Sequence, residues 1–425
     1  MTTKKDPLAL DPGSPENPAI FGKYLLLGLV ARGGMAEVYR ARRMEGDEIV
    51  ALKCMRSRLS REQKYIDMFL AEGQLANILR HENIVRTYEG GRYKNHYYFT
   101  MEYIQGQDLN HVLRKIQINN SRMPIPVALY IASRSLRALD YAHNMKDKDG
   151  TVLTIVNRDV SPSNVRISFE GEVKIIDFGI AKTKARFTSE IGTLKGKFSY
   201  MSPEQIRGLP LDGRTDTFSI GIILYEMLTM ERLFKAESET VLMEKVRKAE
   251  INAPSTINQR ISPELDAVVL KALQRDREER YSSAGEFADA LDKLLEPYKF
   301  NPVELKDLMV RQFPDDYQKE RDIARIAKSL DFSRNSTDAK HESFDTIVNK
   351  EFSLGKVMEL EIDMDDDDND IEEEPVHTKD LLAISRDQSP EPEKADSDLM
   401  KYIYMLLGLT VVVILVIVYL LVLKK

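Results

Sequence analysis

Four short segments that contain charged or amide side chains follow one another along this sequence. They are Val50-Ala-Leu-Lys53, Asn157-Arg-Asp159 with Asn164 shortly after it, Asp177-Phe-Gly179 and Ser202-Pro-Glu204. Lys53 ends an apolar run, where an unpaired charge would be costly. The six histidines are scattered without the spacing of metal ligands, so any metal must be held by oxygen atoms. The segments therefore offer a cation and a set of candidate oxygen ligands.

The secondary structure predicted around these segments changes along the chain, from strands in the first part to helices in the second. Strands are predicted near residues 24–30, 37–41, 48–53 and 96–103, where β-branched and apolar residues alternate with turn signals such as Gly33-Gly34. Helices are predicted over residues 61–79 and 126–145, with further helical patterns beyond them. This order indicates an α+β domain with a small β-rich lobe and a larger helical lobe.

With their order and spacing, the four segments resemble the signature set of the bacterial eukaryotic-like Ser/Thr protein kinases. The resemblance covers about 280 residues, and we place the domain at residues 20–298. It implies the bilobal kinase fold, ATP and Mg²⁺ as cofactors (Mn²⁺ could substitute), and protein substrates with Ser or Thr acceptors. Such a reaction needs the triphosphate held, its charge neutralised and the acceptor hydroxyl aligned.

The resemblance assigns the reacting groups residue by residue. Asp159 corresponds to the base that orients the acceptor hydroxyl, and Lys53 to the lysine that contacts ATP phosphates and is fixed by Glu72. Asn164 and Asp177 correspond to the metal ligands, and oxygen ligands of this kind suit Mg²⁺.

The predicted nucleotide site begins in the glycine-rich stretch at residues 31–38. Ala31 and Ala36 stand where the family's first and third glycines usually lie, whereas Gly33 keeps the position of closest backbone approach to phosphate. The segment at 101–103 resembles the hinge that reads the adenine edge, and Asp108 is placed to meet the ribose. The predicted nucleotide-binding residues are Val30, Ala31, Gly33, Gly34, Val38, Ala51, Lys53, Met101, Glu102, Tyr103 and Asp108.

Further residues correspond to regulatory and structural positions of the family. Arg158 corresponds to the arginine that binds a phosphorylated activation loop, because a guanidinium grips phosphate bidentately. Candidate acceptors in that loop are Thr188, Ser189 and Thr193. Glu204 and Arg280 correspond to a buried ion pair, and Asp216 to a helix-capping aspartate that steadies the catalytic loop.

Three residues depart from the family pattern. Asn157 replaces a histidine, which we expect to weaken an internal brace, and Ser161 replaces a lysine that contacts the transferred phosphate. Lys197 stands in place of a threonine, and we expect it to restore part of that charge. Ser161 and Lys197 leave open some tyrosine phosphorylation. Asn157, Ser161 and the glycine-poor loop leave open an alternative function, a pseudokinase scaffold that binds nucleotide and partners without transfer.

Composition limits the environment of the protein. The 425 residues carry a formal charge of −7 with a pI near 5.6, which gives no reason to expect nucleic acid as a ligand. Cys54 is the only cysteine, so no intrachain disulfide can form, and we expect it to be a plain core thiol in a reducing cytoplasm. Residues 1–19 are a polar lead without an apolar run.

The chain changes character after the kinase-like region. Residues 299–331 have apolar residues at helical spacing, which predicts an extension that either packs on the larger lobe or forms a contact in a homodimer. Residues 332–400 are predicted to be an acidic, disordered linker, in which Ser389 is a candidate phosphosite. Residues 401–423, with an uncharged apolar run from 402, predict a transmembrane helix that anchors the kinase on the cytoplasmic face of the cell membrane.

Overall fold

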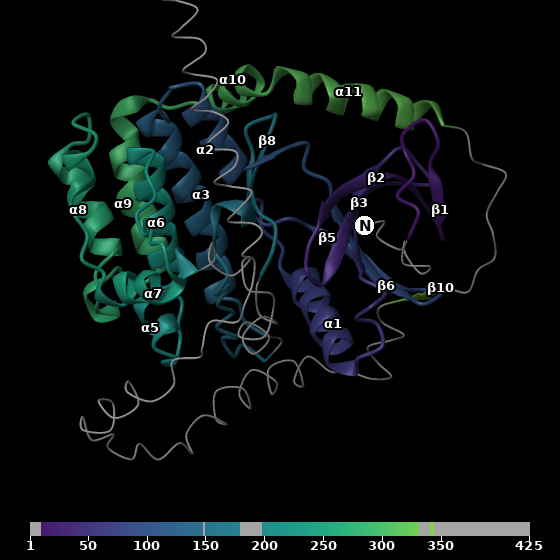
Figure 1. Cartoon of the computed structure of the whole chain (residues 1–425), viewed down its shortest axis with the longest axis horizontal. Helices are drawn as coiled ribbons and strands as arrows, with labels where there is room; N and C mark the ends of the chain where they lie inside the picture. Colours follow the sequence, from purple (N-terminus) through teal and green to yellow (C-terminus); the bar gives the residue numbers. More distant parts are fainter. Residues whose placement is uncertain (1–9, 148, 179–197, 331–340, 344–425) are drawn as a thin grey trace, which may run out of the picture. The chain divides into compact units, whose positions relative to one another are not determined.

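The computed structural model describes residues 10–147, 149–178, 198–330 and 341–343 (Figure 1). Several predictions made from the sequence lie outside these ranges. They concern residues 1–9 of the N-terminal lead, the acidic linker apart from residues 341–343, the transmembrane span, Lys197 and the candidate phosphosites Thr188, Ser189, Thr193 and Ser389. None of the helices in the described part of the chain is long and apolar enough to span a membrane.

The N-terminal lobe is built on an antiparallel sheet. Its strands are β1 (Ala19–Phe21), β2 (Tyr24–Arg32), β3 (Ala36–Arg43), β4 (Ile49–Met55), β5 (Thr87–Tyr93) and β6 (His96–Glu102), in the order β1-β2-β3-β4-β6-β5. A short strand, β10 (His341–Ser343), pairs with the outer edge of β5. The prediction of a disordered linker over residues 332–400 is therefore wrong at these three residues, because the open edge of β5 offers them backbone hydrogen bonds. Helix α1 (Gln63–Ile78) packs on the sheet through Phe69, whose ring lies 5.1 Å from that of Phe99 on β6.

The C-terminal lobe is mostly helical. Its helices are α2 (Leu109–Ile118), α3 (Ile125–His143), α5 (Pro203–Ile206), α6 (Arg214–Thr229), α7 (Glu239–Lys248), α8 (Pro263–Ala272), α9 (Ala284–Leu295), α10 (Pro302–Gln312) and α11 (Pro314–Ser329). Residues 215–229 of α6 are all buried, as expected for a helix at the centre of a lobe. A second sheet, β7 (Gly106–Asp108), β8 (Val165–Ser168) and β9 (Val173–Ile175), lies beside these helices.

The predicted α+β class with a β-rich lobe and a helical lobe is confirmed. The helices predicted at 61–79 and 126–145 correspond to α1 and α3, and the strand predicted at 96–103 corresponds to β6. Cys54 is 2% exposed and belongs to the apolar cluster that contains Leu52. Burial raises the pKa of this thiol, so the expectation of a plain core cysteine is also confirmed.

A glycine fixes the connection between the lobes. A Cβ on Gly106 would lie 1.9 Å from the carbonyl oxygen of Ile167, closer than any real side chain approaches a backbone atom. Gly106 therefore allows β7 to pair with β8, directly after the segment that joins β6 to the second sheet.

The extension after residue 298 packs on the same chain. Leu305, Leu308 and Met309 of α10 are buried in the core of the C-terminal lobe, and Ala327 of α11 is buried against Leu25 of the N-terminal lobe. Packing on the larger lobe, one of the two predicted alternatives, is therefore confirmed for α10. The contact of α11 with the smaller lobe was not predicted.

Truncating the buried face of α10 should destabilise the protein. Leu305 is fully buried, so Leu305→Ala is expected to lower the free energy of unfolding by about 2–5 kcal/mol through lost burial and the cavity left behind. Urea unfolding would measure the change. Val303→Ala, on the same helix but at a side chain that is 54% exposed, is the matched control and should differ from the wild type by less than about 0.5 kcal/mol.

Candidate active site

Lys53 lies in the middle of β4 and contacts two acidic residues. Its Nζ atom donates a hydrogen bond to Glu72 of α1 and lies 3.6 Å from Oδ1 of Asp177. The side chains of Lys53, Glu72 and Asp177 are 15%, 12% and 19% exposed, so the charges compensate one another largely out of water. The sequence prediction that Glu72 fixes Lys53 is confirmed.

Local packing explains why these residues meet. Lys53 pairs with Phe99 across β4 and β6, and the ring of Phe69 packs on Phe99. Glu72 follows Phe69 by three residues on α1, so both side chains lie on the helix face that meets the sheet. The contact between Phe69 and Phe99 therefore holds α1 where Glu72 can reach the lysine.

Asp216 holds the backbone of the catalytic loop. Its carboxylate accepts hydrogen bonds from the N–H groups of Asn157 (2.8 Å) and Arg158 (2.9 Å), and from Nε2 of His143 (2.8 Å). Arg158 has a φ of 62°, a left-handed conformation that costs free energy outside glycine, and these contacts stabilise it. Gln205 adds a bond from its Nε2 to the Arg158 carbonyl, at 3.0 Å.

The predicted capping role of Asp216 needs correction. Helix α6 begins at Arg214 after Gly213, so Asp216 lies inside the first turn and its carboxylate accepts from the catalytic loop instead of capping its own helix. The predicted support of the catalytic loop is confirmed.

Asn157 also behaves differently from the sequence prediction, which expected a weaker brace at this position. Its side chain is fully buried and uses both of its polar atoms. Nδ2 donates to the carbonyl of Asp177 at 2.9 Å, and Oδ1 accepts from the N–H of Asp159 at 3.1 Å. One amide therefore links the segment of the predicted metal ligand to the segment of the predicted base.

Asn164 lies next to both of these segments. Its Nδ2 atom donates to the carbonyl oxygen of Asp159 at 2.8 Å and to Oδ2 of Asp159 at 3.3 Å, while its own carbonyl accepts from Ile176 at 3.0 Å. Because the amide nitrogen is committed to Asp159, the amide oxygen is the atom that could bind a cation. An amide oxygen from Asn164 and a carboxylate from Asp177 form a donor set that fits Mg²⁺.

The predicted hinge begins with the last two residues of β6. Met101 pairs with Ala51 and Glu102 pairs with Val50 across β4 and β6. The Glu102 carboxylate accepts from Nζ of Lys174 at 2.9 Å, a lysine within β9 that the sequence prediction missed. In the sequence, Lys174 is marked only as a charged residue inside an otherwise apolar strand.

Asp108 caps α2. Its Oδ1 accepts from the N–H of His111 at 2.9 Å, and Oδ2 lies 2.7 Å from Nδ1 of the same histidine. This carboxylate therefore already has a structural task. Its contact with a ribose stays a prediction.

The glycine-rich stretch forms a tight hairpin between β2 and β3. Ala31 pairs with Val38, and Gly33 donates its N–H to the carbonyl of Ala36 at 2.8 Å. Val30 and Ala31 thus belong to a strand, and only Gly34 and Met35 occupy the tip of the turn. Two arginines that the sequence analysis did not single out donate to this hairpin, half-buried Arg56 to the carbonyl of Gly33 and exposed Arg58 to the carbonyl of Gly34.

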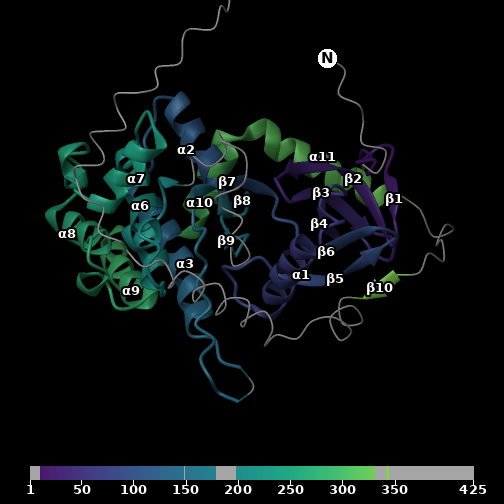
Figure 2. The ribbon, with the colours of Figure 1, turned by 60° about the horizontal axis from the view of Figure 1, so that its bottom comes forward.

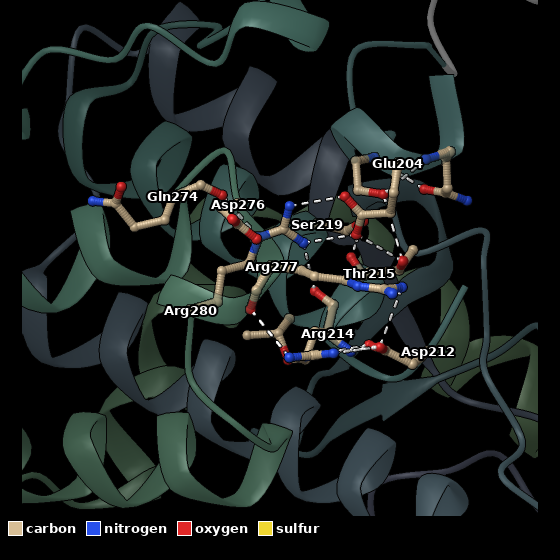
Figure 3. Close-up of polar contacts among 12 residues, drawn as sticks. Glu204, Asp212, Arg214, Thr215, Ser219, Gln274, Asp276, Arg277 and Arg280 are labelled. Carbon is tan, nitrogen blue, oxygen red and sulfur yellow. Dashed lines mark hydrogen bonds and ion pairs between the residues drawn. The ribbon is translucent and has the colours of Figure 1, made fainter. Parts of the chain in front are cut away.

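Glu204 and Arg280 form a buried bidentate ion pair (Figure 3). The two guanidinium-to-carboxylate distances are 2.7 and 2.8 Å, and Thr215 donates a further bond to Glu204 at 2.9 Å. Burial works to raise the pKa of Glu204, but the hydrogen bonds and charge of Arg280 outweigh it and hold this pKa below its usual value. The predicted pair is confirmed.

Glu226 on α6 is a second buried carboxyl, next to Tyr200, and the sequence analysis missed it. It accepts from the Tyr200 hydroxyl at 2.8 Å and from the N–H of Leu233 at 3.2 Å. Arg232 approaches to 3.3 Å, but its side chain is 48% exposed. Burial therefore dominates and raises the pKa of Glu226 to about 8.

This pKa shift predicts a pH dependence of stability. Between the ordinary glutamate pKa of 4.5 and about 8, the folded protein holds a proton that the unfolded chain has lost. The free energy of unfolding should therefore fall as pH rises across this interval. Glu226→Gln removes the contribution, so urea unfolding across the interval should show the wild type losing stability relative to the variant. Parallel curves would contradict the prediction.

Comparison with known proteins agrees with this geometry. The "Protein kinase domain" family matches residues 24–293, and the chain belongs to this family. Among curated proteins, it is 38% identical over 279 residues to the tyrosine-protein kinase MasK of Myxococcus xanthus, an alignment that covers 65% of this chain and 43% of MasK. It is 37% identical over 276 residues to the serine/threonine-protein kinase PknB of Mycobacterium leprae, covering 63% of this chain and 42% of PknB.

The chain thus matches less than half the length of each of these relatives. Among solved structures, the kinase domain of PknI from Mycobacterium tuberculosis superposes with a TM-score of 0.50 at 24% identity. That match covers 67% of this chain and 98% of the PknI chain. At this level of identity the similarity supports the bilobal kinase fold alone.

Proposed function

We propose that this protein is an ATP-dependent protein kinase that transfers the γ-phosphate to protein hydroxyls. The observation that carries the proposal is the arrangement of Lys53, Glu72 and Asp177, in which the lysine contacts both carboxylates within one largely buried cluster. A pseudokinase scaffold has no chemical need for this cluster together with Asp159 and Asn164.

Each residue then has a role in the reaction. Lys53 binds the phosphates, while Asn164 and Asp177 hold Mg²⁺, which supplies charge neutralisation on the phosphate oxygens when bound. Asp159 orients the acceptor hydroxyl and accepts its proton. Asn157 keeps Asp159 and Asp177 in register through its two hydrogen bonds.

We propose Ser and Thr as the main acceptors, as in PknB by its name. MasK is named a tyrosine-protein kinase, so tyrosine is the competing acceptor for this chain. Arg158 would bind an activation loop phosphorylated at Thr188 or Thr193. Phosphopeptide mapping that finds neither residue modified would remove this part of the proposal.

The decisive experiment uses the full chain with γ-labelled ATP, Mg²⁺ and a generic protein substrate, followed by phosphoamino acid analysis. Label on serine and threonine is expected, and chelation of the metal should abolish it. Label confined to tyrosine would overturn the acceptor class. Nucleotide binding without any label, with Mg²⁺ or Mn²⁺, would favour the scaffold function.

We also propose that residues 401–423 anchor the kinase in the cell membrane with its catalytic domain in the cytoplasm. Confinement to a membrane raises local concentration, which would favour phosphorylation between copies of the chain. The chain lacking residues 401–425 should move from the membrane fraction to the soluble fraction. If it stays with the membrane, another segment is the anchor.

A further inference from the structure

The extension formed by α10 and α11 connects the two lobes. Helix α10 is fixed to the C-terminal lobe by buried Leu305 and Met309. Gln312, 9% exposed at the end of α10, accepts a hydrogen bond from Nδ2 of Asn119 at 2.7 Å. Tyr317 at the start of α11 packs its ring 5.4 Å from that of Phe169. The beginning of the extension is therefore held by the larger lobe.

Helix α11 then reaches the smaller lobe. Figures 1 and 2 both show it running from α10 to the strands β2 and β3. Near its end, Ala327 is fully buried in a cluster with Leu25 and Leu27 of β2. Arg42 of β3 donates to the carbonyl of Leu330 at 2.6 Å. The extension is thus attached at both ends, to a different lobe at each.

Between these attachments, Glu320 contacts the predicted hinge. The Tyr103 hydroxyl donates to Oε1 of Glu320 at 2.9 Å, and the Arg40 guanidinium donates to both Tyr103 and Glu320. Arg40 and Glu320 are only 12% and 14% exposed, and the guanidinium carbon lies 4.9 Å from the centre of the Tyr103 ring. Burial raises the pKa of Tyr103 to about 12, so its hydroxyl stays protonated and remains a donor at neutral pH.

Tyr103 belongs to the short segment between the end of β6 at Glu102 and the start of β7 at Gly106. On the proposed function, the backbone of this segment contacts adenine. The same residue therefore faces the nucleotide with its backbone and α11 with its side chain. Glu320 accepts hydrogen bonds from both Tyr103 and Arg40. Its removal would therefore deprive a largely buried phenol and a largely buried guanidinium of the carboxylate that accepts from them.

We propose that Glu320 is a positioning residue for the hinge, and that through Tyr103 and Arg40 it sets the affinity of the kinase for adenine nucleotides. This inference rests on the proposed function, but its first readout, ADP binding, does not require phosphoryl transfer.

The test compares Glu320→Ala and Glu320→Gln with the wild type in the full chain. Glu320→Ala is expected to weaken ADP binding, measured by calorimetry, and to raise KM for ATP by about tenfold, the order expected for losing a buried charge-assisted hydrogen bond. Because Glu320 acts through Tyr103 and Arg40, neither of which has a role in the transfer step, kcat and KM for the protein substrate should change less than about twofold. Glu320→Gln keeps an acceptor oxygen and should lose less affinity.

Asp316→Ala is the matched control, since Asp316 is an exposed carboxylate one turn earlier on α11. It should leave all these constants unchanged. The proposal would be overturned if Glu320→Ala bound ADP with an affinity within twofold of that of the wild type. It would also be overturned if the substitution lowered kcat alone. If Glu320→Ala does not fold, Tyr103→Phe, which removes the hydroxyl that donates to Glu320, decides it by the same ADP criterion. Normal ADP binding with no transfer in the wild type would instead contradict the proposed function.

Discussion

Replacing Asp159 with asparagine is expected to lower kcat by at least about a hundredfold while leaving ADP affinity unchanged. The substitution removes the carboxylate that would take the acceptor proton, and general base catalysis typically contributes about 10²–10⁴ in rate. The backbone bonds of residue 159, to Oδ1 of Asn157 and from Nδ2 of Asn164, do not depend on its side chain and should persist. Initial rates at saturating ATP and Mg²⁺ would measure kcat.

Asp149→Asn provides the matched control, because Asp149 is exposed in the hairpin that follows α3. That hairpin is closed by pairing between Lys146 and Val152 and projects from the lobe in Figure 2. The control should keep full activity. If Asp159→Asn retains more than a tenth of the wild-type kcat with a normal melting temperature, Asp159 is not the base.

The sequence predicted those parts of the site that depend on local pattern. Lys53 in an apolar strand required a partner, but the resemblance to the kinase family was what identified Glu72 as that partner. In the structure, packing between Phe69 and Phe99 places Glu72 within reach of the lysine. The pairing of Glu204 with Arg280, separated by 76 residues, followed only from resemblance to the kinase family. Nothing in either segment alone specifies its distant partner.

Other contacts could not be predicted because they depend on side-chain geometry after folding. A charge inside an apolar segment indicates that a partner exists, but it does not say which one, as Lys174 and Glu226 illustrate. Asn157 was expected to weaken the site, yet its shorter amide reaches both the carbonyl of Asp177 and the N–H of Asp159. The helical spacing of α11 predicted an apolar face, whereas its contact with the hinge uses Glu320, a polar residue outside that pattern.

Replacing Arg280 with methionine is expected to lower the free energy of unfolding by about 3–5 kcal/mol. The Arg280 side chain is fully buried, and its loss would leave the Glu204 carboxylate charged and largely without water. It would also remove the donors to the carbonyls of Arg214, Gln274 and Arg275. Figure 3 shows Arg280 between Glu204 and the segment of Gln274. Urea unfolding followed by circular dichroism would measure the change.

A double substitution distinguishes the ion pair from simple packing. Glu204→Leu combined with Arg280→Met removes both charges, so it should recover much of the stability lost by Arg280→Met alone. Arg277→Met is the control, because Arg277 is 35% exposed and its nearest carboxylate is 3.5 Å away; it should cost no more than about 1 kcal/mol. If the double variant is less stable than Arg280→Met, Glu204 stabilises the fold even without Arg280, through contacts such as its hydrogen bond from Thr215, and the cost of Arg280→Met does not come from an unpaired carboxylate.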